Sequence, residues 1–314
     1  MNRSPRILVV GSINMDLVVR APHMPAPGET VLGSGFATAA GGKGANQAVA
    51  VARQGVECAF LGRVGDDDFG RNLLAGMRAE GIDCEGVMTT PETATGVAMI
   101  VVDASGENSI VVASGANYAV TPDDVFHHAE LFAAADVVLL QLELPVQTVR
   151  AARRQAASHG CKVVLDPAPA PEALPSELCE VDVISPNVSE AEIITGKKAD
   201  EADERVAKLV ASELIARGAR SAVLKLGGRG CMVLCADGHI QRIDPLKVDI
   251  VDTTAAGDAF TASLAVGIAR GLSVADAARR ANAAGALACT KFGAQPSMPT
   301  AEQVEMLLTD QRGQ

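Results

Sequence analysis

Two segments rich in small residues contain the side chains best suited to chemistry. The first reads GGKGANQ over residues 41–47 and places Lys43 and Asn46 at the start of a helical pattern. The second reads DTTAAGD over residues 252–258 and leads directly into an apolar helical run. The free N–H groups in the first turn of a helix bind anions. The sequence therefore predicts an anion site at 252–258, with Asp258 beside it as a candidate general base.

Both segments also have simpler interpretations. The first is not a Walker phosphate loop, because Gly44 follows Lys43 where that loop requires Ser or Thr. It contains no GxGxxG dinucleotide fingerprint either. A glycine-rich helix cap would explain the first segment, and an Asp258 that only caps its helix would explain the second. Spacing alone leaves these alternatives open.

Three further groups lie between these segments. Asn187 and Glu190, three residues apart at a predicted helix start, could organise a hydrated Mg²⁺ or a phosphate, or form an ordinary capping box. The sequence KLGGRG over residues 225–230 follows a predicted strand and indicates either a ligand loop or a tight turn. Glu143 follows another apolar run.

The composition restricts the class of function. The chain has 314 residues, a formal net charge of −11 and a pI of about 5.0, which argues against a nucleic-acid-binding protein. No apolar stretch reaches the roughly 18 residues that a membrane helix needs. The seven cysteines are irregularly spaced and are expected to be reduced thiols. We therefore expect a cytoplasmic protein that binds neither nucleic acid nor membrane.

The elements that must position these residues alternate between strands and helices. Continuous apolar runs predict buried strands at 7–10, 58–61, 137–142, 162–166, 183–185 and 222–226. Helical patterns lie between and after them, at 46–54, 69–80, 146–159, 190–195, 201–217, 257–270, 274–292 and 301–308. This alternation predicts an α/β fold with three layers, in which helices flank a mostly parallel sheet.

Two stretches interrupt the alternation. Residues 16–40 contain short β-like runs at 17–19 and 30–31, and residues 95–117 resemble a hairpin with strands at 96–102 and 109–113. We expect these two insertions to form a small β-sheet lid over the ligand. The sequence has no linker that divides it, so we predict a single domain over residues 1–314 that carries this lid.

With these motifs the sequence resembles the ribokinase-like (PfkB) carbohydrate kinases. Segments 41–47 and 252–258 are similar to the two signatures of that family, and the resemblance runs from GSINMD at 11–16 through PGET at 27–30 to GAQPS at 293–297. It implies a central sheet flanked by helices, with a β lid. It also implies ATP-dependent phosphorylation of the C5 hydroxyl of D-ribose, with Mg²⁺ and an activating K⁺, by a homodimer joined through its lids.

The resemblance also implies roles for individual residues. The implied sugar ligands are Asn14, Asp16, Gly42, Lys43, Asn46, Glu143 and the base Asp258. The implied anion hole is Ala255, Ala256 and Gly257, and the implied nucleotide contacts are Asn187, Lys225, Gly227, Gly228, Arg229, Gly230, Gly257 and Asn282. Glu190 would organise Mg²⁺ through water, and a K⁺ loop would comprise Asp252, Thr254, Ala288, Lys291, Gly293 and Ser297. Lys225 departs from the family, in which a smaller hydroxyl residue is common at this position.

Several other functions remain compatible with the sequence. The nearest is the same chemistry on 2-deoxyribose or fructose, although Lys43 and Asn46 favour ribose. A lid with few aromatic residues makes an adenosine kinase less favoured. A non-catalytic sugar sensor would be expected to lose the base or the anion hole, and both are present. A nucleotide-binding scaffold without transfer would bind ATP with no dependence on sugar.

Overall fold

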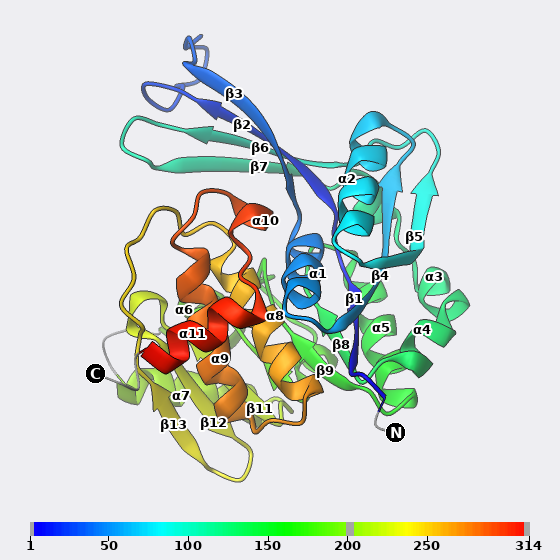
Figure 1. Cartoon of the computed structure of the whole chain (residues 1–314), viewed down its shortest axis with the longest axis vertical. Helices are drawn as coiled ribbons and strands as arrows, with labels where there is room; N and C mark the ends of the chain where they lie inside the picture. The colour runs from blue at the N-terminus through cyan, green and yellow to red at the C-terminus, as the bar shows by residue number, and fades with distance from the viewer. Residues whose placement is uncertain (1–2, 199–203, 311–314) are drawn as a thin grey trace.

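A nine-stranded sheet forms the centre of the molecule (Figure 1). The structure is a computed structural model that describes residues 3–198 and 204–310. The strand order is β13 (Ile240–Ile243), β12 (Cys231–Cys235), β11 (Ser221–Lys225), β10 (Val183–Ile184), β9 (Lys162–Leu165), β8 (Val137–Leu140), β1 (Arg6–Val10), β4 (Glu57–Gly65) and β5 (Asp83–Thr90). The strands from β11 to β5 are parallel, and β12 and β13 extend the sheet antiparallel.

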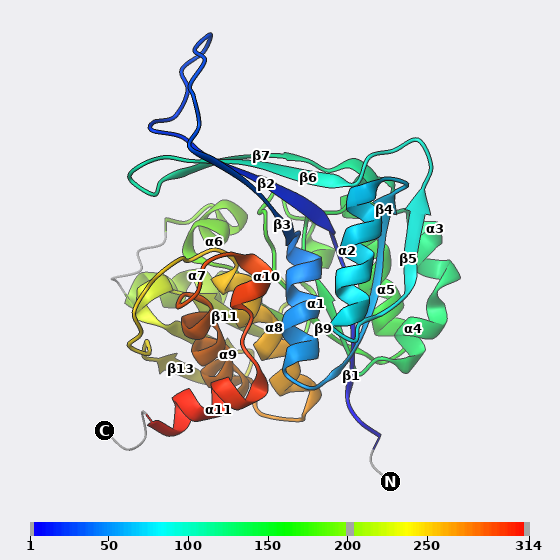
Figure 2. The ribbon, with the colours of Figure 1, turned by 45° about the horizontal axis from the view of Figure 1, so that its top comes forward.

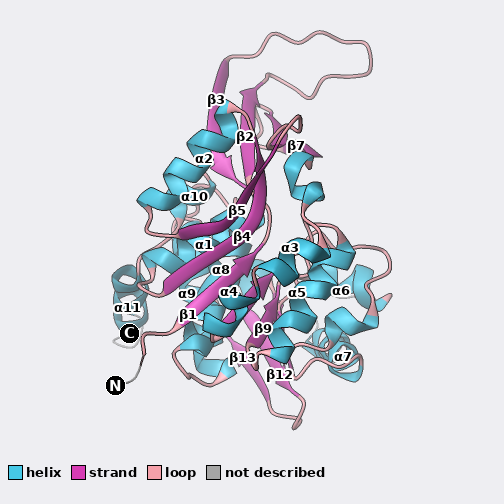
Figure 3. Cartoon of the chain, turned by 90° about the vertical axis from the view of Figure 1, so that its right-hand side faces the viewer, coloured by secondary structure: helices cyan, strands magenta, loops and turns pink. Residues whose placement is uncertain are grey.

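Helices cover both faces of this sheet, which gives the predicted three layers (Figure 3). One layer contains α1 (Lys43–Arg53), α2 (Asp68–Ala79), α8 (Ala256–Ala269), α9 (Val274–Ala288), α10 (Ala294–Ser297) and α11 (Ala301–Asp310). The other contains α3 (Pro122–His127), α4 (Ala129–Ala134), α5 (Val146–Ser158), α6 (Val188–Thr195) and α7 (Glu204–Ala216). Short 3₁₀ turns occur at Gly115–Ala119, Ser176–Cys179 and Gly227–Arg229.

Strand β1 shows why the central strands are apolar without alternation. Ile7 and Val9 pack in the core with α1 and α8, whereas Leu8 and Val10 pack in the core with α5. All four residues are buried because both faces of the sheet are covered. The continuous apolar run therefore predicted the fold class, which is confirmed.

A second, four-stranded sheet lies above the carboxyl ends of the central strands (Figures 1 and 2). Its order is β3 (Gly35–Gly41), β2 (Asn14–Arg20), β6 (Gly96–Val102) and β7 (Asn108–Ala113). The hairpin expected near 96–113 is present, but the strand expected at 30–31 is wrong. Residues 30–31 belong to the long loop between β2 and β3, and the partner of β2 begins at Gly35.

Other boundaries differ from the sequence analysis in limited ways. The helix expected over 274–292 ends at Ala288, where the chain turns into a loop before α10. Of the helix expected over 201–217, residues 201–203 lie outside the described residues, and α7 runs from Glu204 to Ala216. Strands β3, β5, β12 and β13 and helices α3, α4 and α10 were not predicted. Within residues 3–198 and 204–310, no helix is long and apolar enough to span a bilayer.

Candidate active site

A cavity of about 920 Å³ opens at the carboxyl ends of the central strands, between α8, α9 and the loop before α8. Both signature segments contribute to it, because Lys43 and Asp258 line the same space. Its lining includes these sequence-predicted residues: Lys43, Asn187, Glu190, Lys225, Gly227, Gly228, Gly230, Ala255, Ala256, Gly257, Asp258 and Asn282. Open α/β sheets bind ligands at this edge.

Asp258 lies in the first turn of α8 and is only 5% exposed. Asp258 does not cap the helix, because the N-cap residue is Ala255. The carboxylate of Asp258 is instead bound by side chains of α1. Asn46 Nδ2 donates to Asp258 Oδ2 at 2.9 Å, and Gln47 Nε2 donates to Oδ1 at 3.2 Å. Each carboxylate oxygen can still accept one more hydrogen bond, so the group has the capacity to take a proton from a hydroxyl.

The start of α8 has a strained backbone. Ala255 adopts a left-handed conformation with φ 58°, which is uncommon for a residue with a Cβ. The turn leaves the N–H of Gly257 without an intrahelical acceptor, whereas the N–H of Ala256 donates to Thr253 O at 3.3 Å. The segment 255–257 thus presents the positive end of the α8 dipole to the cavity.

Burial and charge raise the pKa of two carboxyl groups near the cavity. Burial raises the pKa of Asp258 to about 6; Lys43 opposes this rise, and Asp166 adds to it. Burial likewise raises the pKa of Asp16 to about 7, and the charges of Glu143 and Asp258 add to that rise. The charge of Asp258 therefore acts on Asp16, although Asp16 lies in the small sheet and Asp258 in the central fold.

Lys43 supplies the positive charge among these carboxylates. Burial alone would lower the pKa of its ammonium, but the surrounding carboxylates raise it above its ordinary value; these are Asp258, Asp166, Glu143 and Glu190. Its backbone N–H donates to Glu143 Oε2 at 3.0 Å, and Ser12 Oγ donates to the same oxygen. Glu143 thus fixes the start of α1 from the end of β8.

The sugar-site residues predicted in β2 lie where this strand enters the small sheet. Asn14 is buried and its Oδ1 accepts from Asn117 Nδ2 at 2.7 Å. The carboxylate of Asp16 lies against Gly41, where an added Cβ would come within 2.3 Å of both oxygens. Gly42 has φ 88°, so its backbone conformation favours glycine as well.

Asn187 and Glu190 form a complete capping box at the start of α6. Asn187 Oδ1 accepts from Glu190 N at 2.8 Å, and Glu190 Oε2 accepts from Asn187 N at 2.8 Å. Both residues also line the cavity. The box is therefore the local reason for this pair, and it holds both side chains at the cavity edge.

The remaining nucleotide candidates are divided between the cavity wall and its surroundings. Gly227, Gly228 and Gly230 line the cavity in the turn after β11, but Arg229 does not line it. Asn282 Nδ2 donates to Asp244 O at 2.8 Å, which joins α9 to the loop that follows β13.

The residues predicted for a cation loop lie on two adjacent segments. Asp252 Oδ1 accepts from Thr254 N at 2.9 Å, and Asp252 Oδ2 accepts from Gly293 N at 2.9 Å. Ala288 and Ser297 are buried and Lys291 is exposed. Asp252 therefore fastens the segment before α8 to the segment between α9 and α10.

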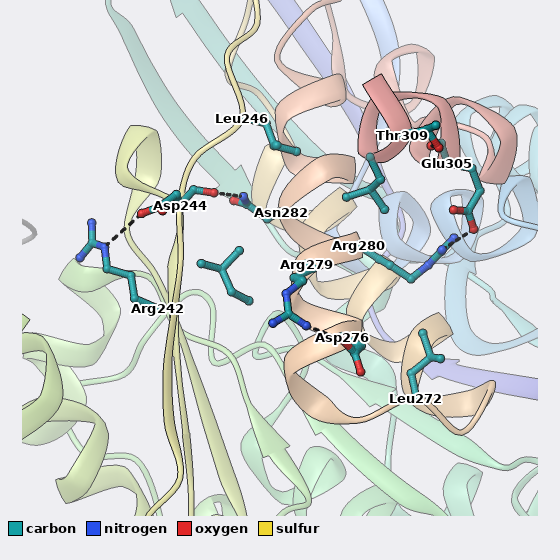
Figure 4. Close-up of a pocket in the computed structure, with 12 residues that line it drawn as sticks. Arg242, Asp244, Leu246, Leu272, Asp276, Arg279, Arg280, Asn282, Glu305 and Thr309 are labelled. Carbon is teal, nitrogen blue, oxygen red and sulfur yellow. Dashed lines mark hydrogen bonds and ion pairs between the residues drawn. The ribbon is translucent and has the colours of Figure 1, made fainter. Parts of the chain in front are cut away.

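A second pocket of about 520 Å³ adjoins the first, and Leu246 and Asn282 line both (Figure 4). Arg279 pairs with Asp276 on α9, and Arg280 pairs with Glu305 of α11. The arginine and carboxylate side chains of this pocket thus neutralise one another. Among the predicted site residues only Asn282 lines it.

Sequence reasoning missed the polar residues that connect the predicted ones. Asp166 and Gln141 follow β9 and β8, and Gln47 lies on α1 one residue after Asn46. Gln47 Nε2 donates to Asp166 Oδ2 at 2.9 Å, and Gln141 Nε2 donates to Gln47 Oε1 at 2.6 Å. The available signal was a polar residue at the end of each predicted parallel strand.

A comparison with protein families identifies the chain. The description "pfkB family carbohydrate kinase" matches residues 4–301, which is nearly the whole sequence. The chain belongs to the pfkB family of carbohydrate kinases. It is therefore a sugar kinase, as the two signature segments and their shared cavity indicate.

Relatives within the pfkB family cover the chain almost completely. A ribokinase of Haemophilus influenzae is 41% identical over 95% of this chain and 96% of its own length. A deoxyribokinase of Salmonella typhi is 35% identical over 96% of this chain and 98% of its own length. A bifunctional ribokinase/ribose-5-phosphate isomerase A of Fructilactobacillus sanfranciscensis is 41% identical over 95% of this chain, which spans 55% of that longer protein.

A solved pfkB-family structure has the same fold. The Arabidopsis thaliana ribokinase complexed with ribose and ATP superimposes with a TM-score of 0.89 and 31% sequence identity. The match covers 98% of this chain and 99% of the Arabidopsis chain. The small sheet and the central fold are thus both part of the shared architecture.

Proposed function

We propose that the protein transfers the γ-phosphoryl group of ATP to the C5 hydroxyl of D-ribose. The observation that carries the proposal is the shared cavity, which is lined both by Asp258 in the first turn of α8 and by Lys43. The names of relatives from Haemophilus and Arabidopsis support ribose as the sugar.

The reaction follows from this arrangement. The C5 hydroxyl gives its proton to Asp258 as its oxygen bonds to the γ-phosphorus, and the bond from that phosphorus to the bridging oxygen breaks to release ADP. The segment 255–257, in which the N–H of Gly257 has no intrahelical acceptor, and the dipole of α8 stabilise the charge on the phosphoryl oxygens. Because the proton leaves late in a loose transition state, an Asp258 pKa of about 6 suits the base role.

Unpaired polar groups support a sugar as the occupant. Asn46 is 5% exposed, and its Oδ1 is a buried acceptor without a hydrogen-bond partner among the described residues. A sugar hydroxyl supplies the donor that such an acceptor needs. We assign sugar binding to Asn14, Asp16, Gly42, Lys43, Asn46, Glu143 and Asp258, and nucleotide binding to Asn187, Lys225, Gly227, Gly228, Arg229, Gly230, Gly257 and Asn282.

The donor set at the cavity edge fits a hydrated Mg²⁺. Oxygen donors suit this ion, and it keeps several of its waters when it binds. The capping box of Asn187 engages only Oε2 of Glu190, so Oε1 faces a metal-bound water in our proposal. Mg²⁺ would neutralise charge on the triphosphate when bound.

The segment around Asp252 is our candidate K⁺ loop, with Thr254, Ala288, Lys291, Gly293 and Ser297. Its donors are a carboxylate and backbone oxygens, which suit a hard monovalent cation. The hydrogen bonds of Asp252 to both segments support this assignment. The loop would act by fixing the backbone before α8, since none of its residues contacts the sugar in our scheme.

The small sheet is our candidate lid and dimer interface. In our proposal the lid is formed by insertions at about 16–40 and 95–117 of a single domain over 1–314, and strands β6 and β7 lie within the second insertion. Large apolar side chains are exposed on it, among them Phe36, Met99, Ile110 and Val111. An edge strand with exposed apolar groups favours association with a second copy.

We place the protein in the cytoplasm, because all seven cysteines are free thiols.

Replacement of the base tests the proposal. Asp258→Asn should lower kcat by about 10²–10⁴-fold, since general base catalysis contributes that much. Calorimetric titration should still show D-ribose binding within a few-fold, because Asn keeps the shape of the side chain. Asp237→Asn, in an exposed turn, is the matched control. Full turnover by Asp258→Asn would remove Asp258 from the base role and would favour another mechanism.

The alternative sugar is 2-deoxyribose, which the similarity to a Salmonella deoxyribokinase favours. The two sugars differ by one hydroxyl. A site that hydrogen-bonds that hydroxyl rejects the deoxy sugar, because its own polar groups are then left unpaired.

A further inference from the structure

A charged pair that the family signatures do not include lies on the cavity wall. Lys225 Nζ donates to Asp166 Oδ1 at 2.9 Å, and the two side chains are only 12% and 2% exposed. Lys225 ends β11 and Asp166 follows β9, so both lie at the carboxyl edge of the sheet. Both residues line the cavity. A buried ion pair contributes little net stability, because removing both charges from water is costly. A pair that lines a ligand cavity therefore suggests a functional role.

Both oxygens of Asp166 are bound by neighbouring side chains. Its Oδ1 binds Lys225, and its Oδ2 accepts from Gln47 Nε2 at 2.9 Å and lies 3.2 Å from Thr261 Oγ1. Asp166 therefore has fewer free acceptor positions than Asp258, whose two oxygens accept one hydrogen bond each, and Asp258 remains the proposed base. Asp166 must therefore act through the groups that it holds.

Lys225 is directed toward the start of α8. A Cβ built on Gly257 would lie 3.6 Å from Lys225 Nζ, so the ammonium is adjacent to the backbone of the proposed anion hole. One of its three N–H groups binds Asp166, and Thr261 Oγ1 is 3.5 Å away. The ammonium can thus offer a further N–H to an anion in the cavity.

We propose that Lys225 is a catalytic cation that contacts the transferring phosphoryl group, and that Asp166 is the positioning residue that holds it there. This inference rests on the proposed kinase function. As the bond to the C5 oxygen forms and the bond to the bridging oxygen breaks, negative charge is spread over the phosphoryl oxygens. A cation fixed beforehand stabilises this charge without reorganisation. Lys225 exchanges no proton, because the hydroxyl proton goes to Asp258.

The same carboxylate is connected to the base. Gln47 Nε2 donates to Asp166 Oδ2 and to Asp258 Oδ1, at 2.9 and 3.2 Å. The charged groups that face Asp258 are Lys43 of α1, Asp16 of β2, Glu143 after β8 and Asp166 after β9. Loss of the Asp166 charge should therefore lower the pKa of Asp258, since that charge raises it.

Steady-state kinetics and ATP calorimetry on the full-length protein test the proposal. We expect Asp166→Asn and Lys225→Gln each to lower kcat/KM for ATP by about 10²–10³-fold, with D-ribose affinity unchanged within threefold. The double variant should be no worse than Lys225→Gln alone, because both changes remove one function. In Asp166→Asn the acidic limb of the pH profile should move to lower pH, which a purely structural role would not cause.

One control variant and the choice of glutamine at position 225 keep the test decisive. Ser263→Ala is the matched control, because Ser263 of α8 is as deeply buried as Asp166. Its hydroxyl donates to Gln54 rather than to a residue that lines the cavity. Lys225→Gln retains a donor for Asp166 and is expected to fold even if Asp166→Asn does not. Wild-type ATP kinetics in Lys225→Gln would overturn the proposal, as would multiplicative losses in the double variant.

Failure of the inference about Lys225 can be distinguished from failure of the proposed function. If the wild-type protein phosphorylates no sugar, the proposed function fails. If it phosphorylates a sugar and Lys225→Gln behaves like the wild type, only the present inference fails. Calorimetry with a nonhydrolysable ATP analogue measures nucleotide affinity separately. We expect a loss of at most about tenfold there, because the Lys225 contact strengthens in the transition state.

Discussion

At the scale of single residues, burial determines what Asp258 can do. Water is largely excluded from its carboxylate, which disfavours the charged form, and Lys43 restores part of the stability of that form. The result is a pKa of about 6, high enough to receive a proton and low enough for the proposed base to be ionised near neutral pH. Asn46 and Gln47 fix the orientation of the two oxygens.

This pKa predicts the pH dependence of the reaction. The base must be ionised to accept the hydroxyl proton, and the raised pKa of about 6 means that the ionised form is lost as the pH falls through that value. We expect kcat/KM for D-ribose to fall about tenfold per pH unit below about pH 6. A pH series of initial rates measures this limb. A rate that stays constant down to about pH 4 would contradict the role of Asp258.

At the scale of elements, the beginning of α8 combines strain with accessible N–H groups. The left-handed Ala255 turns the chain so that Gly257 and Asp258 meet the cavity together. An added Cβ at Gly257 would be in ordinary contact distance of Lys225 Nζ, at 3.6 Å. A methyl group at this position would therefore lie beside the ammonium that we propose contacts the phosphoryl group.

A methyl group at this position should separate stability from activity. Gly257→Ala should keep or raise Tm, because Ala favours a helix over Gly by about 1 kcal/mol. It should lower kcat/KM for ATP by at least about tenfold, since the methyl group occupies the phosphoryl space. Gly76→Ala in α2, where a Cβ meets no atom within 4 Å, is the control for stability with full activity. Unchanged ATP kinetics in Gly257→Ala would place the phosphoryl group elsewhere.

The sequence predicted the helices and strands more completely than the contacts between their side chains. The apolar runs of β1, β4, β8 and β9 were visible because both faces of these strands are buried. Residues 30–31 were mistaken for a strand because Thr30 and Val31 have β propensity, but register with β2 begins at Gly35. The Lys225–Asp166 pair joins residues 59 positions apart, and no local pattern reveals such a contact.

At the scale of the whole molecule, our proposal places both sugar binding and association on the small sheet. Strand β2 carries Asn14 and Asp16 at its start and continues into the exposed part of the sheet (Figure 2). Strand β7 is exposed along its full length and forms one edge of the sheet. A second copy that covers this surface would also restrict the movement of β2.

We predict a dimer that depends on this surface. Val111→Asp should shift the protein toward monomer by at least about tenfold in Kd, because a charge replaces an apolar side chain that is 69% exposed. Sedimentation equilibrium over a range of concentrations measures the effect. Leu209→Asp, on the exposed face of α7, is the matched control and should leave the association unchanged. Equal association of wild type and Val111→Asp would exclude this surface as the interface.

The central claim is tested most directly by an ATP-coupled assay of the wild-type protein on a panel of pentoses and hexoses, in K⁺ and in Na⁺ buffer, with NMR identification of the product. We expect the highest kcat/KM for D-ribose, a product phosphorylated at C5, and higher activity in K⁺. A preference for fructose over D-ribose, or phosphorylation at another hydroxyl, would contradict the proposed function.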